Sequence, residues 1–178
     1  MMLEITHIFM DVDGTLSDGN ILYSNAGGEC KAFSVKDGLI IKALPKLGIF
    51  VIFITSRASS LVEKRGNELD VKYLLQGVTD KKAALLSCVS QEGLNLENIA
   101  YIGDDLNDYA AMKQCGFRSC PADAVREVRD VCDYVSPFHA GHGAVRDVCE
   151  FILKQSGKHS EFVCLFREDY VESSILND

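Results

Sequence analysis

The sequence lacks an excess of positive charge, and it lacks long apolar runs. Its 178 residues include 18 Lys and Arg against 26 Asp and Glu, which gives a formal net charge of -8. This balance argues against a protein whose default role is to bind a nucleic-acid backbone or an anionic membrane. No run reaches the roughly 18 apolar residues of a membrane span, and residues 1–5 have neither the basic start nor the apolar stretch of a signal peptide. We therefore expect a cytoplasmic protein that binds neither nucleic acid nor membrane.

The sequence also lacks Cys-x-x-Cys pairs, internal repeats and low-complexity segments. Its 7 cysteines, an odd number, lie mostly within apolar patterns. We interpret them as reduced, small core residues, which disfavours a structural zinc site. A content of 47% hydrophobic and 25% charged residues is ordinary for a globular domain. We expect that domain to cover residues 1–157, and the apolar pattern dissolves in a C-terminal tail over residues 158–178.

What the sequence does contain is a regular alternation of short apolar runs and amphipathic segments. Residues 8–10, 49–54 and 99–102 are apolar throughout, as expected for strands that are covered on both faces of a parallel sheet. Patterns typical of helices follow these runs. Two short strand-forming runs around a glycine-bearing turn predict a hairpin at about residues 20–34. The sequence thus predicts an α/β fold with a doubly wound, mainly parallel sheet and an inserted β-hairpin.

Polar residues follow the predicted strands, at the ends where ligands bind in such sheets. Right-handed crossovers place the carboxyl ends of parallel strands on one rim. The polar residues expected on that rim are Asp11, Asp13, Thr55, Ser56, Arg57, Lys81, Asp104, Asp105 and Asp108. Taken singly, the Asp-Gly pair at 13–14 also suits a turn, Lys81 a solvated helix position, and Asp104–Asp108 a helix N-terminus. Their occurrence together on one rim favours a functional site.

The residue types on this rim suit phosphoryl transfer. Carboxylates without soft ligands suit Mg2+ better than zinc or copper. Beside a magnesium ion, Asp11 can approach a phosphate group as a nucleophile and form an aspartyl-phosphate. Asp13 is then placed to protonate the leaving alcohol and to activate water. Thr55 offers a hydroxyl to the transferring phosphoryl group, and Lys81 offers a positive charge that stabilises it.

Four stretches of the sequence resemble the four motifs of the haloacid dehalogenase superfamily of phosphatases. In chain order they are Asp11–Thr15, Thr55, Lys81 and Gly103–Asp108. Further stretches, as far as roughly residue 155, resemble the capless 3-deoxy-D-manno-octulosonate 8-phosphate phosphatases and their sialic-acid-type relatives. These stretches are the hairpin of residues 21–33, Ser34–Gly38, Gln76–Gly77 and Gly141–Arg146. The lack of a cap agrees with the length, because no segment between Leu16 and Thr55 or between Thr55 and Lys81 could hold a full cap domain.

The resemblance implies a role for each rim carboxylate. Asp11 would be the nucleophile and Asp13 the acid/base. Mg2+ would be held by Asp11, Asp104 and the backbone carbonyl of Asp13, while Asp105 and Asp108 would orient the metal waters and Lys81. The resemblance also implies a homotetramer, in which the hairpins and C-terminal tails of neighbouring subunits close a site that has no cap of its own.

The resemblance further implies a small sugar-acid phosphate as substrate, most simply 3-deoxy-D-manno-octulosonate 8-phosphate. Arg57 and Arg65 fit this branch, in which arginines meet the sugar carboxylate. The substrate-binding residues would be Asp13, Ser34, Asp37, Gly38, Ser56, Arg57, Arg65 and Lys81. Alternatives are a sialic-acid-type nonulosonate 9-phosphate phosphatase, a catalytically silent oligomerisation or regulatory module, and a phosphotransferase. Ser56 and Ala140 depart from the glycines that are usual at these positions.

Overall fold

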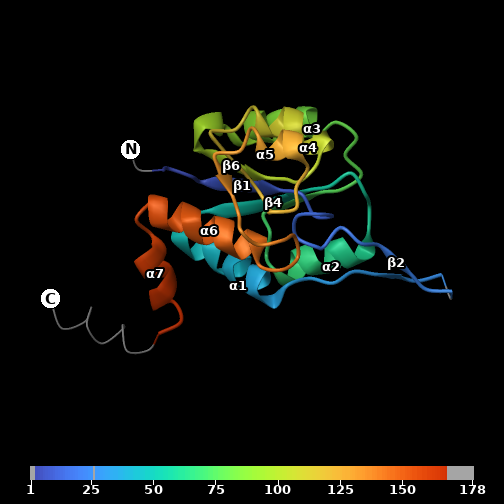
Figure 1. The fold of residues 1–178 in the computed structure, drawn as a ribbon. Coiled ribbons are helices and arrows are strands. Elements are labelled where there is room, and N and C mark those ends of the chain that lie inside the picture. The colour runs from blue at the N-terminus through green and yellow to red at the C-terminus, as the bar shows by residue number, and fades with distance from the viewer. Residues whose placement is uncertain (1–2, 26, 168–178) are drawn as a thin grey trace, which may run out of the picture.

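The structure is a computed structural model that describes residues 3–25 and 27–167. A sheet of six strands in the order β5-β4-β1-β6-β7-β8 forms its centre, and all neighbouring strands run parallel (Figure 1). The strands are β1 (His7–Met10), β4 (Phe50–Ile54), β5 (Tyr73–Leu75), β6 (Ile99–Ile102), β7 (Phe117–Cys120) and β8 (Tyr134–Val135). The predicted α/β fold with a doubly wound parallel sheet is confirmed.

Helices cover both faces of the sheet (Figure 1). One face is covered by α1 (Val35–Ala43), α2 (Ser60–Glu68), α6 (Ala144–Gln155) and α7 (His159–Cys164). The other face is covered by α3 (Lys81–Glu92), α4 (Leu106–Met112) and α5 (Arg126–Arg129). The short 3-10 helices η1 (Leu44–Leu47) and η2 (Leu96–Asn98) lead into β4 and β6. None of the helices in the described ranges is both long and apolar enough to cross a membrane.

The central strand β1 explains why the predicted strands are apolar at every position. Its residues Ile8 and Met10 pack into the core under α1 and α6, while Phe9 between them packs into the core under α3 and α4. All three are fully buried. Because successive side chains of a strand point to opposite faces, a strand covered on both sides needs apolar residues throughout. Burial of one such side chain contributes roughly 1.5–3 kcal/mol.

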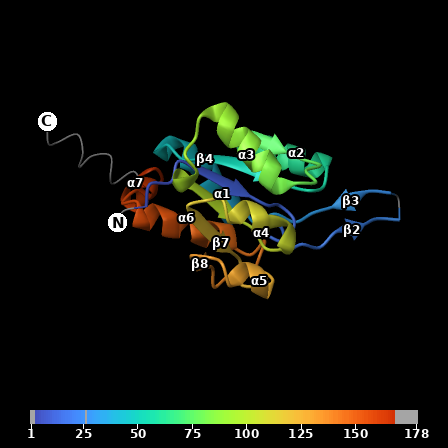
Figure 2. The same ribbon diagram turned by 90° about the horizontal axis from the view of Figure 1, so that it is seen from above.

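The inserted hairpin is the one part of the described chain that leaves the sheet-and-helix body. Strands β2 (Leu22–Tyr23) and β3 (Glu29–Cys30) pair antiparallel and extend away from the sheet (Figure 2). The hairpin follows the loop after β1 and returns to α1, so its base lies beside the carboxyl end of β1. The predicted hairpin is therefore confirmed, and its two strands are short and largely exposed.

Helix α7 lies within the segment that the sequence predicts to be a tail. Its residue Phe162 is only 2% exposed and packs into the core on the α6 side of the sheet. The guanidinium of Arg146 lies 4.9 Å from the centre of the Phe162 ring. A helix of six residues is too short to show a periodic apolar pattern, so no periodicity in the sequence predicts it. The rest of the predicted tail, residues 168–178, lies outside the described residues.

Candidate active site

The carboxyl ends of the central strands bring the predicted site residues to one rim. The register pairs Met10 of β1 with Phe53 of β4 and with Ile102 of β6, so the residues that follow these strands lie at nearly one level. The backbone N–H of the residue after Met10 donates to the carbonyl of Ile102 at 3.0 Å. The site residues that follow these strands within three positions are Asp11, Asp13, Thr55, Ser56, Arg57, Asp104 and Asp105.

One half of the rim is a buried group of four side chains, Asp11, Lys81, Tyr101 and Asp108, which we call the lysine cluster. The ammonium of Lys81 lies 2.8 Å from Oδ1 of Asp11 and 2.7 Å from Oδ1 of Asp108. The Tyr101 hydroxyl donates to the same Asp108 oxygen at 2.8 Å. Burial alone would lower the pKa of Lys81, but its ion pairs with Asp108 and Asp11 raise it above the ordinary value. Lys81 is therefore a buried cation, held between two carboxylates.

The N-terminus of α4 fixes the position of Asp108. Its second oxygen, Oδ2, accepts the backbone N–H groups of Asp104 at 3.2 Å and of Asp105 at 3.5 Å. The Asp105 side chain caps the same helix end. Gly103 makes this arrangement possible, because a Cβ there would lie 2.6 Å from the Asp108 carboxyl carbon. The acidic run after β6 is therefore both a helix cap and a part of the rim.

Asp104 stands beside Asp11 and meets the requirements of a metal ligand. Carboxylate oxygens of Asp11, Asp104 and Asp108 lie within 4.8 Å of one another. Asp108 is already engaged by Lys81 and Tyr101, whereas Asp104 receives one hydrogen bond, from the Thr15 hydroxyl at 2.9 Å. At Gly14, whose φ is +94°, a Cβ would come within 2.1 Å of Asp104 Oδ2. These oxygen donors fit Mg2+, which takes few carboxylates and keeps its other positions for water or phosphate.

The charges of these carboxylates oppose one another. Burial, followed by the charge of Asp108, raises the pKa of Asp11 to about 6. Burial, followed by the charge of Asp11, raises the pKa of Asp104 to about 8. Both shifts disfavour the ionised form, and a divalent cation between the two groups reverses that preference. The electrostatics of the rim thus agree with its geometry in favouring a bound cation.

The other half of the rim is a more open group of four side chains, Asp13, Glu29, Lys31 and Arg57, which we call the hairpin cluster. The side chain of Lys31, at the base of the hairpin, is fully buried and its ammonium contacts Oδ1 of Asp13. Arg57 places Nε 3.8 Å from Oδ2 of Asp13, and its Nη2 donates to Oε2 of Glu29 at 3.2 Å. Two cations, Lys31 and Arg57, therefore contact the predicted acid/base Asp13, and Glu29 contacts both of these cations.

Comparisons with known proteins agree with this geometry. Residues 74–148 match the haloacid dehalogenase-like hydrolase family. The 3-deoxy-D-manno-octulosonate 8-phosphate phosphatase KdsC of Escherichia coli is 40% identical over 158 residues, which are 89% of this chain and 84% of that protein. The chain belongs to the 3-deoxy-D-manno-octulosonate 8-phosphate phosphatase family. The family's enzyme from Yersinia pestis is 41% identical over 155 residues, 87% of this chain and 83% of its own.

Solved structures of the same family match the whole architecture. That of the Moraxella catarrhalis phosphatase, in complex with a magnesium ion, a phosphate ion and KDO, gives a TM-score of 0.90 at 42% identity and covers 93% of this chain and 95% of that one. The cobalt-bound form of the Haemophilus influenzae phosphatase gives 0.85 at 37% identity, with 89% and 93% covered. As in a capless phosphatase, the chain between β1 and β4 holds only the hairpin, α1 and η1.

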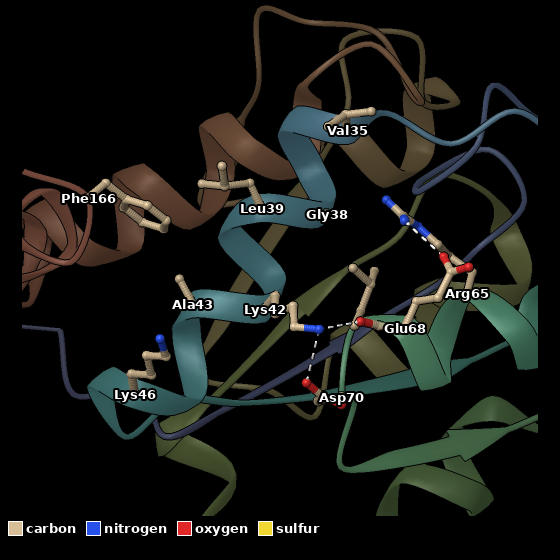
Figure 3. Close-up of a pocket in the computed structure, with 11 residues that line it drawn as sticks. Val35, Gly38, Leu39, Lys42, Ala43, Lys46, Arg65, Glu68, Asp70 and Phe166 are labelled. Carbon is tan, nitrogen blue, oxygen red and sulfur yellow. Dashed lines mark hydrogen bonds and ion pairs between the residues drawn. The ribbon is translucent and has the colours of Figure 1, made fainter.

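Not all of the predicted substrate-binding residues of this family meet at the rim. Arg65 lies about one helix turn from the hairpin side, where it donates to the carbonyl of Ser34 at 3.2 Å and to Glu68 at 3.3 Å. It borders an open groove of about 500 Å3 between α1 and α2, which Gly38 also lines (Figure 3). Asp37 is buried, and its carboxylate accepts the backbone N–H of Arg146 at 2.7 Å, which ties α1 to the start of α6. Of the predicted set, Gly38 and Arg65 therefore line the groove between α1 and α2, and Asp37 lies buried between α1 and α6.

The remaining predicted residues lie on the loop after β4. Thr55 is 2% exposed, and its hydroxyl accepts the backbone N–H of Arg57 at 3.4 Å. The Ser56 hydroxyl accepts a hydrogen bond from the Asn107 side chain at 3.4 Å, which links this loop to α4.

The positions of the two clusters that the sequence does not predict are Tyr101, Glu29 and Lys31. Tyr101 lies in a strand that is buried throughout, so its hydroxyl is hidden in an apolar pattern. Glu29 and Lys31 lie in a short hairpin without apolar periodicity, so a single sequence carries no pattern that marks them.

Proposed function

We propose that this chain hydrolyses 3-deoxy-D-manno-octulosonate 8-phosphate to 3-deoxy-D-manno-octulosonate and phosphate. The observation that carries the proposal is the pairing, on one rim, of a lysine cluster that suits phosphoryl transfer with an arginine that suits a sugar carboxylate. The relatives of Escherichia coli and Yersinia pestis, which bear the name of this activity, support it. The Moraxella catarrhalis structure, whose ligands are magnesium, phosphate and KDO, supports it further.

Asp11 acts as the nucleophile in this proposal. One carboxylate oxygen is held by Lys81, and the carboxylate attacks phosphorus while the bond to the sugar oxygen breaks. Asp13 gives its proton to the leaving oxygen, then takes a proton from the water that attacks the aspartyl-phosphate, so that Asp11 is restored and phosphate leaves. The Thr55 hydroxyl and Lys81 stabilise the charge on the transferring group.

The cofactor in this proposal is Mg2+, held by Asp11, Asp104 and the backbone carbonyl of Asp13. When bound, it supplies the positive charge that lets a carboxylate approach a phosphate dianion. Asp108 does not need to bind the ion directly, because its contacts with Lys81, Tyr101 and the start of α4 keep the neighbouring groups in place. Asp105, the exposed cap of α4, is left to orient metal waters.

The sugar acid is recognised by Arg57 in this proposal. Its planar guanidinium offers two parallel N–H groups, which match a carboxylate better than the point charge of a lysine does. Arg57 lies on the loop after β4 and is 39% exposed at the side chain, so an incoming ligand can reach it. Arg65 supports the wall of this subsite through Ser34 rather than through Arg57.

We also infer that the enzyme assembles as a homotetramer and works in the cytoplasm. Apolar side chains are exposed along the hairpin and the start of α1, where Leu22, Tyr23 and Val35 are 62%, 74% and 81% exposed. Such a surface is typical of an interface between subunits. All 7 cysteines are free thiols, which suits a reducing compartment. Sedimentation equilibrium of the wild type and of Tyr23→Ser tests the assembly, and a monomeric wild type would contradict it.

The decisive experiment is phosphate release with Mg2+ from the octulosonate 8-phosphate and, in parallel, from a nonulosonate 9-phosphate. We expect a strong preference for the octulosonate. Preference for the nonulosonate would keep the mechanism and change the substrate. Turnover of neither, with a well-folded protein, would instead favour a silent oligomerisation or regulatory module.

A further inference from the structure

The hairpin places a carboxylate of the protein on the arginine that is proposed to receive the carboxylate of the substrate. Oε2 of Glu29 accepts Nη2 of Arg57 at 3.2 Å. Its other oxygen, Oε1, lies 3.5 Å from the Ser59 hydroxyl and 3.5 Å from the Lys31 ammonium. The Glu29 side chain is 23% exposed, so it stands at the boundary between the rim and solvent.

Glu29 does not occupy the whole guanidinium, to which the Tyr23 side chain is also hydrogen-bonded. Glu29 engages a single nitrogen, Nη2, whereas a guanidinium can hold a carboxylate by two parallel hydrogen bonds. Among the described residues, the buried Nε of Arg57 and the buried Oδ2 of Asp13 have no hydrogen-bond partner. These two atoms face each other across 3.8 Å. A buried donor and a buried acceptor that form an ion pair without a hydrogen bond indicate a place where a ligand group completes the network.

We propose that Glu29 is a stand-in for the sugar carboxylate. Glu29 pairs with Arg57 in the free enzyme, and the carboxylate of the substrate displaces it on binding. The proposal rests on the proposed function, because it takes Arg57 as the sugar-acid receptor. The displaced Glu29 already has alternative partners in Lys31 and Ser59 at 3.5 Å. The exchange therefore keeps every charged group paired before and after binding.

This exchange makes Glu29 a residue that sets ligand affinity at Arg57. A sugar acid compensates Arg57 for the loss of Glu29, whereas a neutral sugar phosphate does not, because it leaves a partly buried guanidinium without its carboxylate. The same exchange weakens sugar-acid binding, because the native pair must first be broken. Glu29 thus lowers the affinity for every ligand that displaces it, while the discrimination between acidic and neutral sugars comes from Arg57.

The test is calorimetric titration of the Mg2+-loaded enzyme with 3-deoxy-D-manno-octulosonate, using the wild type, Glu29→Gln and Glu29→Asp. Glutamine keeps the shape of the side chain and removes its charge, so we expect sugar-acid binding to tighten roughly 5-fold, the effect of a partly exposed ion pair. Aspartate keeps the charge on a shorter side chain, and we expect its affinity to lie between the other two. Because Glu29→Gln spares both ligands the same broken pair, the ratio of kcat/KM for a neutral sugar phosphate to that for the sugar acid should stay at the wild-type value.

Matched controls separate exchange at Arg57 from a general effect of charge. Glu63→Gln removes an exposed carboxylate from α2, and we expect wild-type affinity. In an Arg57→Ala background, Glu29→Gln should give no further gain. Melting curves check that each variant is folded.

The possible failures point to different conclusions. Wild-type turnover of the octulosonate 8-phosphate, combined with unchanged or weaker binding in Glu29→Gln, would overturn the stand-in role alone. A tighter Glu29→Gln in both arginine backgrounds would overturn it as well. Absence of wild-type turnover would overturn the proposed function and, with it, this inference.

Discussion

Both halves of the rim pair cations with carboxylates, but the charged side chains are buried in one half and, apart from Lys31, partly exposed in the other. In the lysine cluster, one cation lies between two carboxylates, and Lys81 and Asp108 are 3% and 0% exposed. In the hairpin cluster, Arg57 and Glu29 are 39% and 23% exposed at the side chain, and two buried polar atoms lack partners. The first half is fixed by the parallel sheet and by helices on one face, while the second depends on a loop and a hairpin. Under the proposed function, phosphoryl transfer therefore belongs to the lysine cluster, the rigid half, and the choice of substrate to the hairpin cluster, the adjustable half.

The largest expected effect is the loss of turnover when the proposed nucleophile of the lysine cluster is replaced. Asp11→Asn removes the attacking oxygen but keeps the shape of the side chain, so we expect kcat to fall at least about 1,000-fold. The fold should persist, because the variant also removes one of the mutually repelling carboxylates. Phosphate release and the melting temperature check the two statements. Activity near that of the wild type would rule out Asp11 as the nucleophile.

The second prediction concerns the stability of the same half. Lys81→Met leaves Asp11 and Asp108 buried without their counter-charge, which costs about 3–5 kcal/mol in the free energy of unfolding. The neighbouring Lys82→Met, at an exposed position of the same helix turn, should change it by less than about 0.5 kcal/mol. Urea denaturation without metal measures both. Equal effects of the two substitutions would show that burial of Lys81 does not matter for stability.

The third prediction concerns Arg57 in the hairpin cluster. Arg57→Ala should reduce kcat/KM for the sugar-acid phosphate by about 10- to 100-fold, which is the range for a hydrogen-bonded charge. A small phosphate ester without a carboxylate should lose far less. Arg57→Lys, which keeps the charge without the planar fork, should recover only part of the loss. Equal losses on both substrates would remove the arginine from carboxylate recognition.

The fourth and smallest expected effect is the pH dependence of stability that the carboxylates Asp11 and Asp104 cause. Because the pKa of Asp11 is raised to about 6 and that of Asp104 to about 8, the folded protein without metal binds protons that the unfolded chain releases at lower pH. Its stability therefore falls as pH rises from about 4 to about 8. Mg2+ replaces those protons, so the increase in melting temperature on adding Mg2+ should grow from about pH 5.5 to about pH 8.5. An increase that shrinks over this range would contradict the assignment of these carboxylates as ligands.

The sequence predicted the rigid half better than the adjustable half, for a physical reason. Asp11 and Asp104 follow strands that are apolar throughout, and parallel strands must deliver their carboxyl ends to one rim. Lys81 could be placed on that rim from its helix start, although its burial between two carboxylates depends on the packing of α3 against β1 and α4. The pattern thus indicated which residues meet but not how deeply they are buried.

The contacts of the hairpin could not be predicted in this way. Glu29 and Lys31 belong to a segment whose strands have two residues each, so no period marks the inward side. Asp37 was expected to bind substrate, but its contact with the backbone of Arg146 depends on how α1 and α6 meet in space. The burial of Phe162 in α7 depends on the same packing. Long-range packing of short elements is therefore what a single sequence conceals.

The hairpin is one uninterrupted stretch of chain that leaves the body after Ser17 and returns before Ser34. Its strands pair only with each other, and the sheet of six strands closes without them. Glu29, the hairpin residue that pairs with Arg57, can therefore be replaced together with its whole segment without altering the register of the sheet. The partner of the proposed sugar-acid receptor thus lies on a segment that can be grafted by itself, while Arg57 stays on the loop after β4.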